Sequence, residues 1–224
     1  MNLRFHMIAI GMLAVSSTLA LSGQAQSSAS PVNEQQAAED ALENWVRDNY
    51  RSVLDMVFMN SCDVPKASGE MRWIVCARII PSESGEPEYV VMVGKGYDGK
   101  SFARITRPKG QAVYTQIGNY KREHPTAASS DLIKFIVLET KEGDEKEFPA
   151  LASIEDELEH IRFSPVLPDI LFIDPTEFDI SLQALWGNKI EIVMYGPGSS
   201  VAGQPHPLLS WVAKTRHILN ASFK

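Results

Sequence analysis

The chain has 224 residues, of which 44% are hydrophobic, 22% charged and 8% aromatic. This composition is ordinary for a globular protein and excludes a disordered chain, a collagen-like repeat and a coiled-coil filament. The formal net charge of −7 gives no support to nucleic-acid binding, because contacts with phosphates need clustered Lys and Arg side chains. We therefore expect a globular protein that does not bind nucleic acid.

The N-terminal segment has the pattern of a signal peptide. Arg4 precedes an apolar stretch from Met7 to Leu21, and small residues stand at positions −3 and −1 of a cleavage site after Ala25. The stretch is short for a membrane span, which needs about 20 apolar residues; retention as an uncleaved anchor is the alternative. The expected regions are a signal peptide at 1–25, a flexible leader at 26–32 and a single α+β domain at 33–224. We expect a periplasmic or secreted protein.

The chain contains two cysteines, Cys62 and Cys76. An even number of cysteines in an exported chain predicts a disulfide bond. The two cysteines do not have the C-x-x-C spacing of a redox pair, and the further ligands of a zinc site are missing at suitable spacing. We therefore expect a structural disulfide, with no metal and no cofactor.

The first half of the expected domain predicts one long helix followed by strands. Apolar residues recur with helical spacing from Ala38 to Phe58, and Asn33 with Gln36 resembles a capping box at the helix start. Short runs of β-branched and aromatic residues, separated by turn formers, predict strands at 71–80, 88–93, 101–106 and 111–117. The loops are too short for parallel crossovers, so residues 71–118 are predicted to form an antiparallel meander.

The second half alternates less regularly. The pattern predicts a buried strand at 132–140, a helix at 154–161, strands at 169–173 and 189–195, and a C-terminal helix opened by Pro207. The resulting fold class is α+β, with a mixed, mainly antiparallel sheet covered by an N-terminal and a C-terminal amphipathic helix.

One segment matches the phosphate-binding pattern G-x-x-x-x-G-K-[ST]. The residues that would bind a nucleotide are Gly94, Gly99, Lys100 and Ser101. A phosphate cradle of this type needs a helix after the loop, whereas the residues after Ser101 alternate as a strand. Asp98-Gly99 between two strand-like runs is a strong signal for a hairpin turn. We therefore predict a hairpin, and nucleotide binding, with Asp174 as the Mg²⁺ ligand, is the weaker alternative.

A glycine-rich segment at 196–203 lies between a predicted strand and the last helix, an order that can bind an anion. The residues that would contact the anion are Gly196, Gly198, Ser199 and Ser200. A hydrolase could use Ser199 or Ser200 as nucleophile, His206 or His124 as base and Asp174 to orient the base. The G-x-S-x-G pattern of such enzymes is absent, so the sequence identifies no catalytic residue.

The sequence thus favours a non-catalytic, soluble binding protein over an enzyme. Inhibitor, immunity and envelope-accessory roles fit a small exported α+β domain with one disulfide, and the expected partner is another envelope or secreted protein. This hypothesis predicts an exposed apolar or aromatic patch. The alternatives are a hydrolase that uses the 196–206 loop and, least favoured, a P-loop nucleotide-binding protein.

Overall fold

The computed structural model describes residues 31–64, 70–81, 86–161, 176–184, 189–196 and 206–223. The predicted signal peptide and the predicted strand at 169–173 lie outside these residues. Among the helices within them, none combines the length and the apolar character that a membrane crossing requires.

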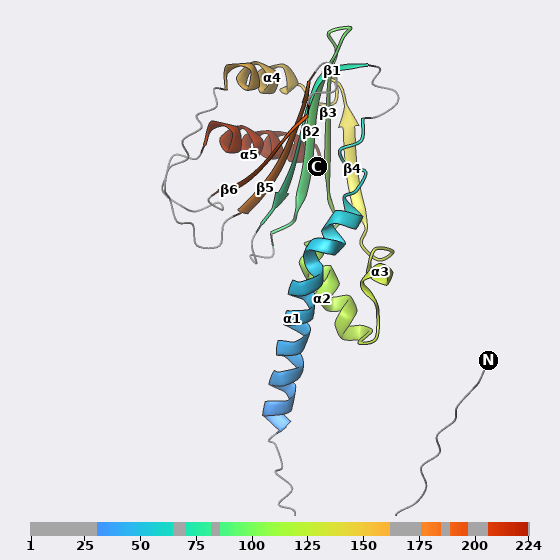
Figure 1. The fold of residues 1–224 in the computed structure, drawn as a ribbon. Helices are drawn as coiled ribbons and strands as arrows, with labels where there is room; N and C mark the ends of the chain where they lie inside the picture. The colour runs from blue at the N-terminus through green and yellow to red at the C-terminus, as the bar shows by residue number, and fades with distance from the viewer. Residues whose placement is uncertain are drawn as a thin grey trace, which may run out of the picture.

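The structure consists of one six-stranded sheet and five α-helices in its described part (Figure 1). In chain order the elements are α1 (Pro31–Val57), β1 (Met71–Ile80), β2 (Tyr89–Gly96), β3 (Ser101–Pro108), α2 (Val113–Glu123), α3 (Ser129–Leu132), β4 (Leu138–Gly143), α4 (Leu151–His160), β5 (Thr176–Ala184), β6 (Lys189–Gly196) and α5 (Pro207–Asn220), followed by a 3₁₀ turn at Ala221–Phe223. The α+β class is therefore confirmed.

The strands are ordered β4-β3-β2-β1-β5-β6, and every neighbouring pair is antiparallel. Strands β1 to β4 form a meander, and β5 returns to pair with the free side of β1. In the centre of the sheet, Val75 on β1 lies between Val93 on β2 and Leu182 on β5. The sheet is thus antiparallel throughout rather than mixed.

Helices cover both faces of the sheet. Because successive strand residues point to opposite faces, Val91 and Val93 pack with Trp211 and Leu208 of α5, on the face that α4 also covers. Val90 and Met92 point the other way, into a second core that contains Leu54 from the C-terminal half of α1. The N-terminal half of α1 runs past the sheet and lies beside α2 (Figure 1).

Helix α1 confirms the predicted long helix, but it begins at Pro31 rather than at Asn33. Proline is favoured at the first helical position, because a backbone N–H group at that position has no acceptor within the helix, so its absence costs nothing. Asn33 therefore lies inside the helix, so the predicted capping box is wrong and the end of the predicted leader is helical.

The predicted strand at 111–117 is wrong, because these residues enter helix α2. Gly110, with φ of +85°, turns the chain after β3, and the buried carboxylate of Glu88 then accepts hydrogen bonds from the first N–H groups of the helix. Val113 and Ile117 are one helical turn apart and both buried, a spacing that fits a helix as well as a strand. A distant side chain thus overrides the β-propensity of this segment.

The predicted buried strand at 132–140 is also wrong over most of its length. Leu132 ends the short helix α3, a turn follows, and the strand β4 runs only from Leu138 to Gly143. Strand β4 is half-exposed and is the fourth strand of the meander. Residues 111–117 were predicted to form that fourth strand. Cross-strand ion pairs of Glu139 with Arg107 and Glu142 with Arg104 fix its pairing to β3.

Candidate functional site

A hollow with a largely apolar lining lies between α1 and α2, and Glu88 holds these two helices in place. Glu88 precedes β2 and is fully buried. Its carboxylate accepts hydrogen bonds from the backbone N–H of Val113 at 2.7 Å and of Tyr114 at 3.3 Å, and from the Tyr50 hydroxyl at 2.5 Å. A negative charge at a helix N-terminus is stabilised by the free N–H groups there. Glu88 therefore fastens both α2 and α1 to the sheet.

Burial, followed by the charge of Glu88, raises the pKa of Tyr50 far above its ordinary value. The phenol is consequently held in its neutral form and donates to the carboxylate. The Tyr50 ring also meets the Tyr114 ring edge-on, with centroids 5.3 Å apart. This contact closes the end of the α1–α2 pair that lies nearest the sheet.

Further along, α1 and α2 approach each other closely at Gly118 and then leave a gap. A Cβ atom added at Gly118 of α2 would lie 4.0 Å from Val46 of α1, so the helices are close at that point. Beyond it lies a groove with a volume of about 580 Å³, within the range of about 300–1,000 Å³ typical of ligand sites. We call it the α1–α2 groove; its lining residues are Gln35, Ala38, Glu39, Ala41, Leu42, Trp45, Lys121, Arg122 and Pro125.

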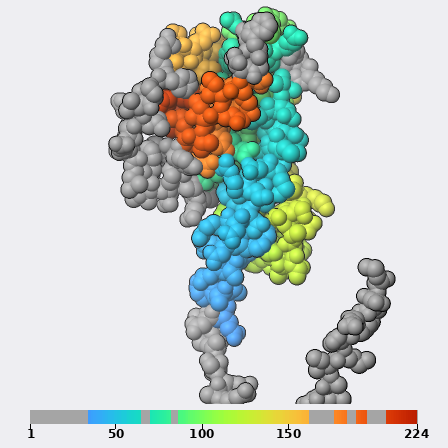
Figure 2. Space-filling model, viewed as in Figure 1, coloured from blue at the N-terminus to red at the C-terminus, as the bar shows by residue number. Residues whose placement is uncertain are grey.

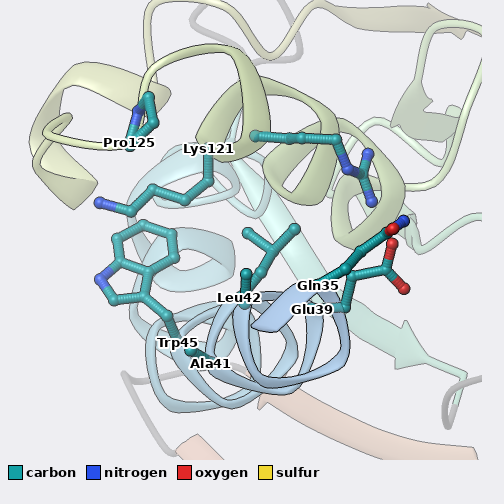
Figure 3. Close-up of a pocket in the computed structure, with 9 residues that line it drawn as sticks. Gln35, Glu39, Ala41, Leu42, Trp45, Lys121 and Pro125 are labelled. Carbon is teal, nitrogen blue, oxygen red and sulfur yellow. The ribbon is translucent and has the colours of Figure 1, made fainter. Parts of the chain in front are cut away.

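Figure 3 shows the apolar centre of the α1–α2 groove and its polar rim. Leu42 points from α1 toward α2, while Trp45 and Lys121 lie together at one side. The Lys121 ammonium is 4.2 Å from the centre of the Trp45 ring and donates to the carbonyl of Ala127 at 2.8 Å. At the other side Glu39 and Gln35 form the rim. The groove can therefore receive apolar groups and offers charged groups only at its edge.

A second hollow lies beside the C-terminal half of α1, on the face of β5 and β6 visible in Figure 2. Its volume is about 400 Å³. Arg51 crosses it from α1 and forms ion pairs with Glu177 and Asp179, each at 2.6 Å. Burial raises the pKa of Glu177, and the neighbouring Arg51 offsets that rise only in part. The ion pairs of Arg51 with both carboxylates link α1 to β5 across this hollow.

The predicted cysteine pair lies at the edge of this second hollow. Cys62 and Cys76 are at disulfide distance, with Cα atoms 5.8 Å apart. They join the turn after α1 to β1, which is the connection that the sequence predicts.

The P-loop pattern lies in the β2–β3 hairpin. Gly94 is a strand residue packed against β1, where an added Cβ would approach the Met71 side chain to 2.6 Å. Gly99 forms the turn with φ of +79°. The exposed Lys100 pairs with Asp98 at 2.7 Å, and Ser101 begins β3. No helix follows Ser101, so the arrangement that would bind a phosphate is not formed here.

The residues of the alternative hydrolase site are only partly within the described structure. Asp174, Gly198, Ser199 and Ser200 lie outside it, and Gly196 ends β6 opposite Thr176. His206 caps α5, where its Nδ1 accepts from the backbone N–H of Leu208 at 3.2 Å. His124 ends α2 and stacks on Tyr120, with ring centres 4.4 Å apart. The two histidines therefore have local structural roles at helix ends.

Other polar groups form no further site in the part of the chain that the structure describes. The buried carboxylate of Glu155 on α4 pairs with Lys95 at 3.2 Å, but neither hollow is lined by it. Among the described residues, no group of three or more His, Cys, Asp and Glu side chains is placed to hold a metal ion.

Comparisons with protein-family models, with curated proteins and with solved structures find no match for this chain. The amphipathic pattern of residues 38–58 predicted one wall of the α1–α2 groove. The other wall was not predicted, because residues 111–117 were expected to form a strand. The helical spacing of Val113 and Ile117, continued by Lys121, is the signal that could have revealed it.

Proposed function

We propose that this protein is a non-catalytic binding module that receives apolar side chains of a partner protein in the α1–α2 groove. The observation that carries the proposal is the groove itself, an apolar hollow of about 580 Å³ with Trp45 and Leu42 in its lining. Aromatic residues that line a concave surface are typical anchors of protein interfaces.

The position of the α1–α2 groove supports the same proposal. The side chains at 34–41 of α1 are all exposed, and this half of the helix stands clear of the sheet (Figures 1 and 2). A partner can therefore reach the groove without displacing the core. The cysteine pair at disulfide distance is consistent with an exported protein, because disulfides persist in oxidising compartments. We accordingly propose a periplasmic or secreted location and an envelope or secreted partner.

The test compares two variants of neighbouring alanines. Ala38 lines the groove, whereas Ala37 is also exposed on the same helix but does not line it. The tagged wild-type protein is used to capture partners from an envelope fraction, and the affinity of each captured protein is then measured. We expect Ala38→Gln to weaken binding at least about tenfold, because a longer polar side chain fills the groove, and Ala37→Gln to leave it unchanged. A partner bound equally by both variants would refute the use of the groove.

A further inference from the structure

The two walls of the α1–α2 groove carry opposite charges. Among the lining residues, α1 contributes one carboxylate, Glu39, and no cation, whereas α2 contributes Lys121 and Arg122 and no carboxylate. In the part of the chain that the structure describes, none of these three side chains belongs to an ion pair. Lys121 donates to the carbonyl of Ala127 at 2.8 Å and Arg122 to the side chain of Asn119 at 3.1 Å, and neither acceptor is charged.

A partner of one charge sign would match only one of these walls. A basic segment in the groove would meet Lys121 and Arg122, and an acidic segment would meet Glu39. Complementary potentials require a surface that presents cations toward α1 and a carboxylate toward α2. A second copy of the same groove, turned by a two-fold rotation, presents this pattern.

The projecting half of α1 points to the same occupant. Its side chains at 34–41 are all exposed, although Ala38, Ala41 and Leu42 form an apolar stripe along the groove. Helices in proteins gain most of their stability from packing an amphipathic face against other elements. Two α1–α2 pairs packed face to face would form a four-helix bundle, an arrangement that buries such stripes in its core.

We therefore infer that the partner in the α1–α2 groove is a second copy of this chain, in an isologous dimer. Leu42 and Trp45 of the two copies meet at the centre of the contact, and Glu39 of each copy faces Lys121 and Arg122 of the other. Dimers with two-fold symmetry are the commonest oligomers of soluble proteins. The inference rests on the proposed function and specifies its partner.

Charge also determines which helices face each other in this dimer. A two-fold axis parallel to the helices places α1 of each copy against α2 of the other. An axis across the helices would place α1 against α1, and between Pro31 and Val46 this helix has four acidic residues and neither Lys nor Arg. Like charges across an interface are unfavourable, so the parallel axis is expected.

The test begins with the oligomeric state of the full exported chain. Light scattering and sedimentation over about 1–100 µM protein should show a concentration-dependent dimer. We expect Ala38→Gln to raise the dissociation constant of the dimer at least about tenfold, because the longer side chain fills the groove, and Ala37→Gln to leave it unchanged.

A mixing experiment then distinguishes contacts between copies from contacts within one copy. Glu39→Lys and Arg122→Glu each bring like charges together in a dimer, so either variant alone should raise the dissociation constant at least about tenfold at low salt. An equimolar mixture of the two variants again brings opposite charges together, and should bind within about fivefold of the wild type. The control Glu145→Lys, at an exposed position on the β4–α4 turn, should dimerise like the wild type.

Three results would overturn the inference: a monomer at every concentration, a dimer that Ala38→Gln does not weaken, or a mixture no tighter than the single variants. These outcomes are separable from failure of the proposed function. If a different captured protein binds and Ala38→Gln weakens its binding, the proposed function stands and the inference alone fails. If neither a dimer nor a captured partner responds to Ala38→Gln, both fail.

Discussion

Replacement of Glu88 tests the central claim about how the α1–α2 groove is built. In Glu88→Ala, three donors lose their acceptor: the backbone N–H groups of Val113 and Tyr114 and the hydroxyl of Tyr50. Each buried donor left without a partner costs about 1–3 kcal/mol. Two of the three sites are only partly buried, so we expect the free energy of unfolding to fall by about 3–5 kcal/mol.

This decrease in the free energy of unfolding is a large fraction of the total for a typical domain, which is about 5–15 kcal/mol. A milder variant is therefore needed as well. Glu88→Gln keeps the shape of the side chain but places an amide N–H₂ against one of the donors. Urea unfolding at pH 7 should show a loss of about 1–3 kcal/mol for this variant.

A double-mutant cycle with Tyr50→Phe separates the hydrogen bond from general packing. Tyr50→Phe should cost about 1 kcal/mol in the wild-type background and close to nothing when Glu88 is already Ala, because its acceptor is gone. The same cost in both backgrounds, or a loss below about 1 kcal/mol for Glu88→Ala, would refute the proposed anchoring.

Three further predictions concern other parts of the structure. Burial and the charge of Glu88 raise the pKa of Tyr50, so the unfolded state loses the phenolic proton first, and the free energy of unfolding falls above about pH 10 by up to about 1.4 kcal/mol per pH unit. Urea unfolding from pH 8 to 11 should show a smaller fall in this free energy for Tyr50→Phe, and identical pH profiles would contradict the raised pKa. Reduction of the Cys62–Cys76 pair should lower the free energy of unfolding by about 3 kcal/mol, whereas two free thiols in the denatured, unreduced protein would rule out the bond. Gly99→Ala should cost about 1–2 kcal/mol because φ is +79° there, and a neutral effect in thermal unfolding would show that the hairpin turn is misplaced.

The sequence alone determined the elements whose signals are local. The apolar stripe of α1, the Asp98-Gly99 turn, the strands β1 to β3 and β6, and the C-terminal helix opened by Pro207 all follow from periodicity, capping and turn chemistry within a few residues. The predicted antiparallel pairing of successive strands also held for β1 to β3, because short loops permit no other arrangement.

Long-range contacts determined the conformation of the segments whose local signals were ambiguous. Residues 113–117 could alternate as a strand or turn as a helix, and Glu88, distant in sequence, resolved the choice by accepting hydrogen bonds from the first N–H groups of α2. The fourth strand of the meander was then supplied by Leu138–Gly143, through ion pairs with β3. The helical spacing of Val113, Ile117 and Lys121 could indicate the second wall of the α1–α2 groove, but not that α2 lies beside α1. A site built from a long-range hydrogen bond becomes visible only when the distant partners are brought together.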